Sequence, residues 1–170
     1  MNTSLKARIF VITLAFASLP ARPSSAEVPV AIDAPDETIA TTVHAEGAQI
    51  YECKADSGGK LSWQAREPIA TLVLDGKTIG RHFAGPNWEH IDGSAVRARM
   101  VSNAPGSTAS DIPWLKLEVT NSLGHGAFTG VTTIQRINTR GGMAQGLCET
   151  AGGFLSVPYH ADYVFLRPVE

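Results

Sequence analysis

Apolar and polar residues alternate along most of this chain, and this period-two pattern constrains the fold more than any other feature. In the segment 114–120, for example, Leu115, Leu117 and Val119 alternate with polar residues. Successive side chains of a strand point to opposite faces of a sheet, so such a segment has one face against a core. The same pattern predicts strands at 38–44, 48–54, 61–66, 69–74, 77–84, 87–91, 95–102, 128–139 and 157–166. No segment carries a sustained helical stripe, which predicts an all-β protein.

Two Asp-Gly dipeptides, at Asp75-Gly76 and Asp92-Gly93, separate neighbouring predicted strands. Because Asp-Gly accepts the positive φ angles of a tight hairpin turn, each pair of flanking strands should be antiparallel. Many short strands separated by turn signals are typical of a sandwich or a closed barrel. We therefore expect an antiparallel β-sandwich or barrel-like fold, and the pattern leaves both architectures open.

The first 26 residues are typical of a signal peptide. Lys6 and Arg8 precede an apolar run over 9–19, and Ser24-Ser25-Ala26 supplies the small residues of a cleavage site. The run is too short to span a bilayer comfortably, and we expect no membrane span after cleavage. Residues 1–26 should be removed, leaving 27–170 as a single β domain with an extended arm at 27–37. The expected location is periplasmic or secreted.

The chain has two cysteines, Cys53 and Cys148. In an exported protein, thiols of compatible geometry are usually oxidised, and the two residues do not form a Cys-x-x-Cys motif. We expect one disulfide between them. Closing a loop of this length would stabilise the fold by roughly 4–5 kcal/mol on the chain-entropy model.

The charge of the mature chain argues against nucleic acid as a partner. Removing Lys6, Arg8 and Arg22 leaves 11 basic and 16 acidic residues, a net charge of −5. Without a basic run, the chain lacks the electrostatic footprint that phosphate backbones require. A small molecule or a glycan fits this composition better, and the sequence leaves the oligomeric state open.

The segment 124–130 approximates a glycine-rich dinucleotide fingerprint. That motif needs a helix N-terminus after its glycines to hold the pyrophosphate. Here Val131, Thr132, Thr133 and Ile134 follow, and their β-branched side chains favour a strand. We therefore expect a turn between strands and no cofactor.

No metal site is expected from the spacing of possible ligands. His160 and Asp162 lie on one face of a predicted strand, but no neighbouring residues supply further ligands. Both residues are typical of a solvated strand face.

Two stretches carry the candidate binding residues. The segment 82–89 brings His82, Trp88 and Glu89 together around a Gly-Pro corner, and the segment 135–139 places Gln135, Arg136 and Asn138 near a glycine-rich loop at 141–156. An arginine donates in a fixed fork, and amides both donate and accept, so such groups can recognise a carboxylate or a sugar. Tyr159, on the last predicted strand, completes this set of candidates.

These motifs together resemble the family called domain of unknown function 3455, found in bacteria and fungi. The resemblance covers most of the mature chain and is carried by the segments 47–53, 82–89, 92–94, 112–115, 134–139 with 141–142, Cys148, 157–159 and 161–163. Phe83, Asn87, Gln145 and His160 depart from residues common in the family. The resemblance implies secretion and a shared β fold, and it implies no established reaction.

Three functions follow as hypotheses. The first is a secreted or periplasmic binding protein for a small polar molecule or a glycan. The second is a cofactor-independent enzyme, a lyase, isomerase or hydrolase, with His82 as general base and Arg136 stabilising negative charge. The third is an envelope structural or interaction domain without a small-molecule site.

Overall fold

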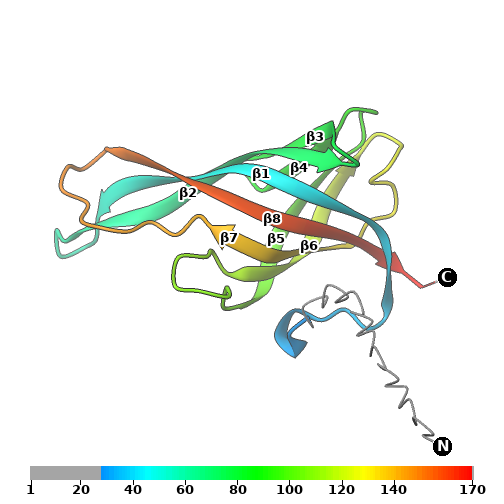
Figure 1. Cartoon of the computed structure of the whole chain (residues 1–170), viewed down its shortest axis with the longest axis horizontal. Helices are drawn as coiled ribbons and strands as arrows, with labels where there is room; N and C mark the ends of the chain where they lie inside the picture. The colour runs from blue at the N-terminus through cyan, green and yellow to red at the C-terminus, as the bar shows by residue number, and fades with distance from the viewer. Residues whose placement is uncertain (1–27, 170) are drawn as a thin grey trace, which may run out of the picture.

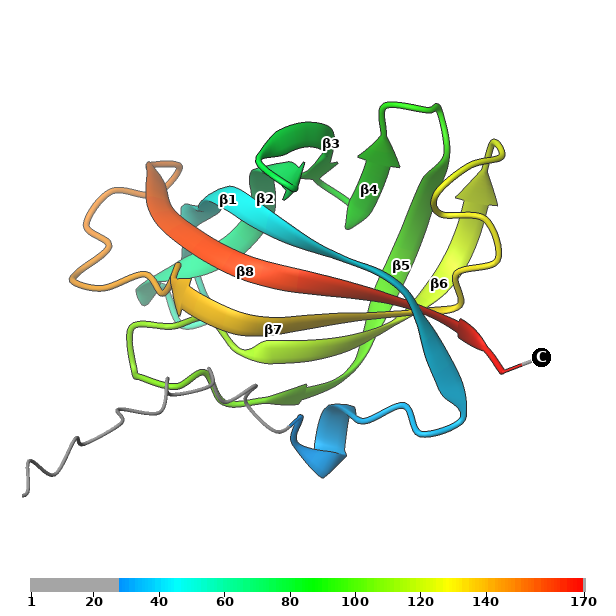
Figure 2. The same ribbon diagram turned by 45° about the vertical axis from the view of Figure 1, so that its right-hand side comes forward.

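The computed structural model describes residues 28–169, so the expected signal peptide at 1–26 lies outside the described residues. Eight antiparallel strands form a closed barrel in chain order, and β8 returns to pair with β1 (Figures 1 and 2). The strands are β1 Glu37–Ala55, β2 Leu61–Leu74, β3 Lys77–Phe83, β4 Asn87–His90, β5 Ala95–Ala104, β6 Trp114–Leu123, β7 Thr133–Gly141 and β8 Phe154–Pro168. The all-β prediction is confirmed, and the architecture is the barrel. Within residues 28–169, no helix is long and apolar enough to cross a membrane.

Both predicted hairpins form, but their turns differ. At the β2–β3 connection, Asp75 and Gly76 both have positive φ, 50° and 72°, as the dipeptide predicted. At the β4–β5 connection only Gly93 has positive φ, 87°. There the carboxylate of Asp92 accepts hydrogen bonds from the backbone N–H and the hydroxyl of Ser94, at 2.8 and 2.7 Å. The Asp92 side chain thus stabilises a longer turn.

Strands β1 and β2 are each continuous where the sequence suggested a break. In β1, the residue at the expected break is Gly47, and a Cβ there would lie 2.1 Å from the Ile69 carbonyl oxygen of β2. Only glycine permits this close approach between the two strands. In β2, the expected break is at Pro68, which has no N–H to donate. Pro68 is tolerated because it lies in a half of β2 that pairs with β1 alone.

Strand β7 begins at Thr133, five residues later than the alternation predicted. The preceding glycine-containing segment, 124–130, forms turns and leads into this strand. As expected, the sequence that resembles a dinucleotide fingerprint is not followed by a helix.

The barrel interior holds the main core, which includes Val43, Leu72, Trp88, Ile134 and Phe165. Outside the barrel wall, the 3-10 turn η1 (Val30–Ile32) places the buried Ile32 against Ala104 and Trp114. The segment before β1 was expected to be an extended arm. It is instead folded at η1, because Ile32 finds an apolar cluster to pack against.

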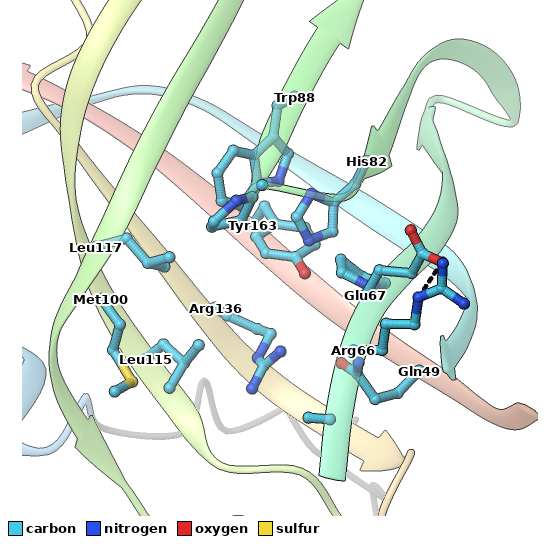
Figure 3. Close-up of a pocket in the computed structure, with 14 residues that line it drawn as sticks. Gln49, Arg66, Glu67, His82, Trp88, Met100, Leu115, Leu117, Arg136 and Tyr163 are labelled. Carbon is cyan, nitrogen blue, oxygen red and sulfur yellow. Dashed lines mark ion pairs between the residues drawn. The ribbon is translucent and has the colours of Figure 1, made fainter. Parts of the chain in front are cut away.

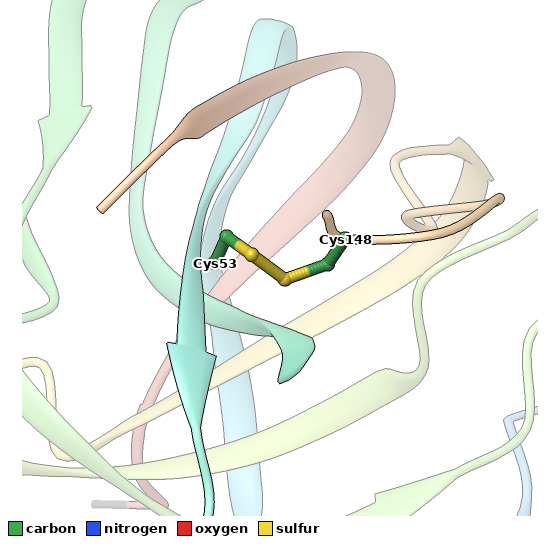
Figure 4. The surroundings of a disulfide bond; sticks show 2 residues. All are labelled: Cys53 and Cys148. Carbon is green, nitrogen blue, oxygen red and sulfur yellow. A yellow bond between two sulfur atoms is a disulfide. The ribbon is translucent and has the colours of Figure 1, made fainter. Parts of the chain in front are cut away.

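The predicted disulfide between Cys53 and Cys148 is confirmed, with Cα atoms 5.6 Å apart (Figure 4). It attaches the long loop 142–153 to β1, and the Gly152 N–H also donates to the Cys53 carbonyl at 2.9 Å. The same loop pairs with the other long connection through a bridge between Asp111 and Gly142. The two long loops therefore support each other.

The barrel wall has a lateral gap because β3 and β4 are short. Strand β2 pairs with β3 only from Ala70 to Leu74, which leaves residues 61–69 with no described strand on that side. Strand β5 pairs with β4 only from Ala95 to Arg97. Residues of the free half of β2, of the β3–β4 turn and of the free half of β5 line one pocket, which opens at this gap.

Candidate functional site

A cavity of about 220 Å³ lies inside the barrel at this opening (Figure 3). All eight strands contribute to its wall. The lining residues used below are Gln49, Arg66, Glu67, His82, Trp88, Met100, Leu115, Leu117, Arg136 and Tyr163. Met100, on the free half of β5, is 56% exposed and marks the rim. The site is thus a small pocket that opens through the side of the barrel.

Arg136, on β7, is the principal charge of the cavity and is only 8% exposed. Its Nε and Nη2 atoms donate to the Pro113 carbonyl oxygen at 3.1 and 2.8 Å. No carboxylate of the described residues forms an ion pair with it. Burying a charge without a counter-charge costs several kcal/mol. The structure therefore holds a positive charge in the cavity that no acid of the described chain neutralises.

His82, on β3, is buried and neutral. Its Nδ1 lies 2.8 Å from the Asn87 carbonyl oxygen, and because a carbonyl only accepts, Nδ1 carries the proton. Burial lowers the pKa of His82 to about 3, the Asn87 hydrogen bond opposes this shift, and the Arg136 charge adds to it. Near neutral pH the ring therefore has an unprotonated Nε2, which can accept a hydrogen bond.

Aromatic rings hold His82 in place. The imidazole stacks on Trp88 with ring centroids 4.2 Å apart and meets the edge of Tyr163 at 5.0 Å. Burial raises the pKa of Tyr163, and the nearby Arg136 charge opposes this shift. The indole N–H of Trp88 is buried and has no hydrogen-bond partner among the described residues. Trp88 thus lines the cavity and also buries a donor that no described residue satisfies.

The rim carries a pair of opposite charges and an amide. Arg66 and Glu67 lie 3.5 Å apart between Nε and Oε1, and Figure 3 shows this ion pair beside Gln49. Gln49 is buried, and its amide nitrogen donates to the Ile50 carbonyl at 3.2 Å. Since the charges of Arg66 and Glu67 offset each other, Arg136 dominates the electrostatics of the cavity.

The structure brings together three of the sequence-predicted residues, His82, Trp88 and Arg136, in the cavity. Tyr159 is buried beside them in the core, and its hydroxyl lies 3.3 Å from that of Tyr163. Burial raises the pKa of Tyr159.

Three other predicted residues lie away from the cavity lining. Glu89 pairs with Arg81 on the outside of the barrel, at 2.6 Å. Gln135 donates to the Ile32 carbonyl at 2.7 Å, and Asn138 donates to Asp162 at 2.8 Å. Gln135 and Arg136 are consecutive in β7, so they face opposite sides of the wall.

Sequence reasoning missed Gln49 and Tyr163 as cavity residues. Gln49 continues the inward-facing series of Val43 and Ala45 along β1. A polar residue at a core-facing position is a local inconsistency of the kind that marks functional sites. That signal was available in the alternation itself.

Comparison with known proteins matches one family. The family described as "Protein of unknown function (DUF3455)" matches residues 34–77 and 73–167. Searches of curated proteins and of solved structures find no match. The matched residues cover the barrel from before β1 into β8. The chain therefore belongs to the DUF3455 family of proteins of unknown function.

Proposed function

We propose that this protein is a periplasmic or secreted binding protein that holds a small organic anion, such as a short carboxylate, in the barrel cavity. The observation that carries this function is the buried Arg136, which has a cavity beside it and no acidic partner among the described residues. A carboxylate at this position would supply the missing counter-charge. The disulfide between Cys53 and Cys148 supports an oxidising location.

The polar groups of the wall are complementary to such a ligand. The guanidinium uses two of its five N–H groups on Pro113, which leaves three for a ligand. The Trp88 N–H is a further unsatisfied donor, and the neutral His82 offers an acceptor for a ligand hydroxyl. Several donors and one acceptor in an apolar cavity suit a carboxylate with a neighbouring hydroxyl better than a cation.

The size of the cavity favours a small molecule over a glycan chain. Pockets for drug-sized ligands have volumes of about 300–1,000 Å³, whereas this cavity is about 220 Å³. A ligand of only a few heavy atoms fits that space.

The properties of His82 favour binding over catalysis. A general base works best when its pKa is close to the operating pH, and burial lowers the pKa of His82 to about 3. The imidazole is therefore a weak base, suited to accepting a hydrogen bond. A purely structural role accounts for the two hydrogen bonds of Arg136 to Pro113, but it leaves the charge beside the cavity without a counter-charge among the described residues.

Calorimetric titration with formate, acetate, lactate and succinate tests the proposal, with glucose as the neutral probe. We expect saturable binding of at least one carboxylate and loss of that binding in Arg136→Gln. Arg136→Lys keeps the positive charge but loses the planar donor geometry of the guanidinium, so this variant should still bind the carboxylate, with lower affinity. Arg99→Gln is the matched control, because Arg99 is exposed and pairs with Glu118 on the outside.

A second measurement remains informative if the Arg136 variants are unstable. The Trp88 indole N–H of the wild-type protein gives its own NMR signal, assigned with Trp88→Phe. A bound carboxylate should shift this signal more than those of Trp63 and Trp114. If no carboxylate binds, or if Arg136→Gln folds and binds as the wild type does, the proposed function is wrong.

A further inference from the structure

The outer face of the β1–β8 ladder carries a second polar cluster, separate from the cavity. In the register of these strands, His44 lies opposite Asp162, and Glu46 lies opposite His160. Residues directly opposite in an antiparallel pair have their side chains on the same face. The intervening Ala45 is buried toward the barrel interior, so the four polar side chains face outward.

Three of these side chains bring possible metal ligands close together. Single ligand atoms of His44, Glu46 and His160 all lie within 4.8 Å of one another. The Nε2 atom of His44 is 3.8 Å from the Glu46 carboxylate. A tetrahedral zinc ion with bonds of about 2.0–2.1 Å separates its ligand atoms by roughly 3.3 Å. The side chains are exposed, so small rotations suffice to reach that spacing.

The fourth residue, Asp162, orients the imidazole of His44. Its Oδ1 lies 2.9 Å from His44 Nδ1, so the carboxylate accepts the Nδ1 proton and leaves Nε2 free to bind a metal. Its Oδ2 in turn accepts a hydrogen bond from Asn138 at 2.8 Å. Asn138 has a φ of 52° at the register shift of β7. A carboxylate behind a ligand histidine is a common arrangement in metal sites.

We propose that His44, Glu46 and His160 bind a divalent transition metal ion of the zinc class, with Asp162 and Asn138 as positioning residues. Two imidazoles and one carboxylate suit Zn²⁺ and its neighbours, whereas Ca²⁺ and Mg²⁺ prefer oxygen ligands throughout. Because the cluster lies at the surface, water completes the coordination. The spacing within β8 alone predicted no metal site, since the remaining ligands come from β1.

Calorimetric titration of the metal-free protein with Zn²⁺, after purification without a histidine tag, tests this site. We expect one zinc ion per chain, and loss of saturable binding in His44→Ala and in His160→Ala. Asp162→Asn should weaken binding about 10-fold or more, as is typical for residues that orient a ligand histidine. Co²⁺ should give the visible absorption of a four- or five-coordinate ion in the wild type, and this signal should disappear in His44→Ala.

His125→Ala is the matched control, because His125 is exposed and lies in the 124–130 turn, outside the cluster. It should leave the affinity for Zn²⁺ unchanged. An affinity weaker than about 1 mM, or equal zinc binding by His44→Ala and His125→Ala, would overturn the assignment. Carboxylate binding in the cavity should be the same in all these variants, so the two sites can fail independently.

Discussion

Replacing His82 with glutamine should make the protein less sensitive to mild acid. In the native state, burial holds the pKa of His82 at about 3, below the ordinary value of 6.5. As the pH falls below 6.5, the unfolded chain therefore binds a proton that the native protein does not. Proton uptake by the unfolded state favours unfolding, so the wild type loses stability as the pH falls toward 3. Glutamine does not titrate and removes this contribution.

The size of the effect follows from these two pKa values. Well below pH 6.5, each further drop of one pH unit lowers the free energy of unfolding by about 1.36 kcal/mol, because only the unfolded state takes up the proton. Between about pH 7.5 and pH 4.5, the His82 contribution amounts to about 2.6 kcal/mol. Asp92 and Asp111, whose pKa values are lowered by hydrogen bonds, add further acid sensitivity only below their ordinary value of 3.8. The chosen range therefore keeps the contributions of these two aspartates small.

Urea unfolding followed by tryptophan fluorescence, with the disulfide intact, measures this difference. Between pH 7.5 and pH 4.5, the free energy of unfolding of the wild type should fall by about 2.6 kcal/mol more than that of His82→Gln. Subtracting one curve from the other removes the contributions of the other histidines. His125→Gln, at an exposed position, should run parallel to the wild type. Parallel curves for wild type and His82→Gln would refute a buried, neutral imidazole.

Two further variants test the framework. Replacing both Cys53 and Cys148 with alanine should lower the free energy of unfolding by roughly 4–5 kcal/mol, because the disulfide closes a loop of 95 residues. Urea unfolding measures this loss, and a value below about 1 kcal/mol would contradict the stabilising role of the disulfide. Gly47→Ala should cost at least about 2 kcal/mol, because its Cβ would overlap the Ile69 carbonyl of β2. Gly58→Ala is the control, because a Cβ at Gly58 would meet only an ordinary contact. Equal melting temperatures for Gly47→Ala and Gly58→Ala would rule out the clash with the Ile69 carbonyl.

Local features of the sequence determined the strands, one turn and the covalent link. The alternation of apolar and polar residues predicted segments within all eight strands, because the period of a strand is a property of each short segment. Asp75-Gly76 predicted its turn because both residues tolerate positive φ. Two cysteines in a chain that we expected to be exported left one natural pairing.

The sequence could not place every candidate on the correct side of the wall. Of the two neighbours in β7, Arg136 faces the cavity and Gln135 faces η1. The alternation establishes that they face opposite ways, but the register of β7 against β6 and β8 decides which one faces inward. Asn138 lies at the register shift between Ile137 and Arg140 with a φ of 52°, and this irregularity carries its side chain to the outer face, where it donates to Asp162.

Only the tertiary structure decided where the two sites are. The cavity exists because β3 and β4 are too short to fill the wall between β2 and β5, a mismatch that no single segment reveals. The outer cluster exists because closure of the barrel sets β1 beside β8, which brings His44 and Glu46 next to His160 across more than a hundred residues of sequence. Alternation along a strand is local, whereas partner and register depend on contacts between distant segments.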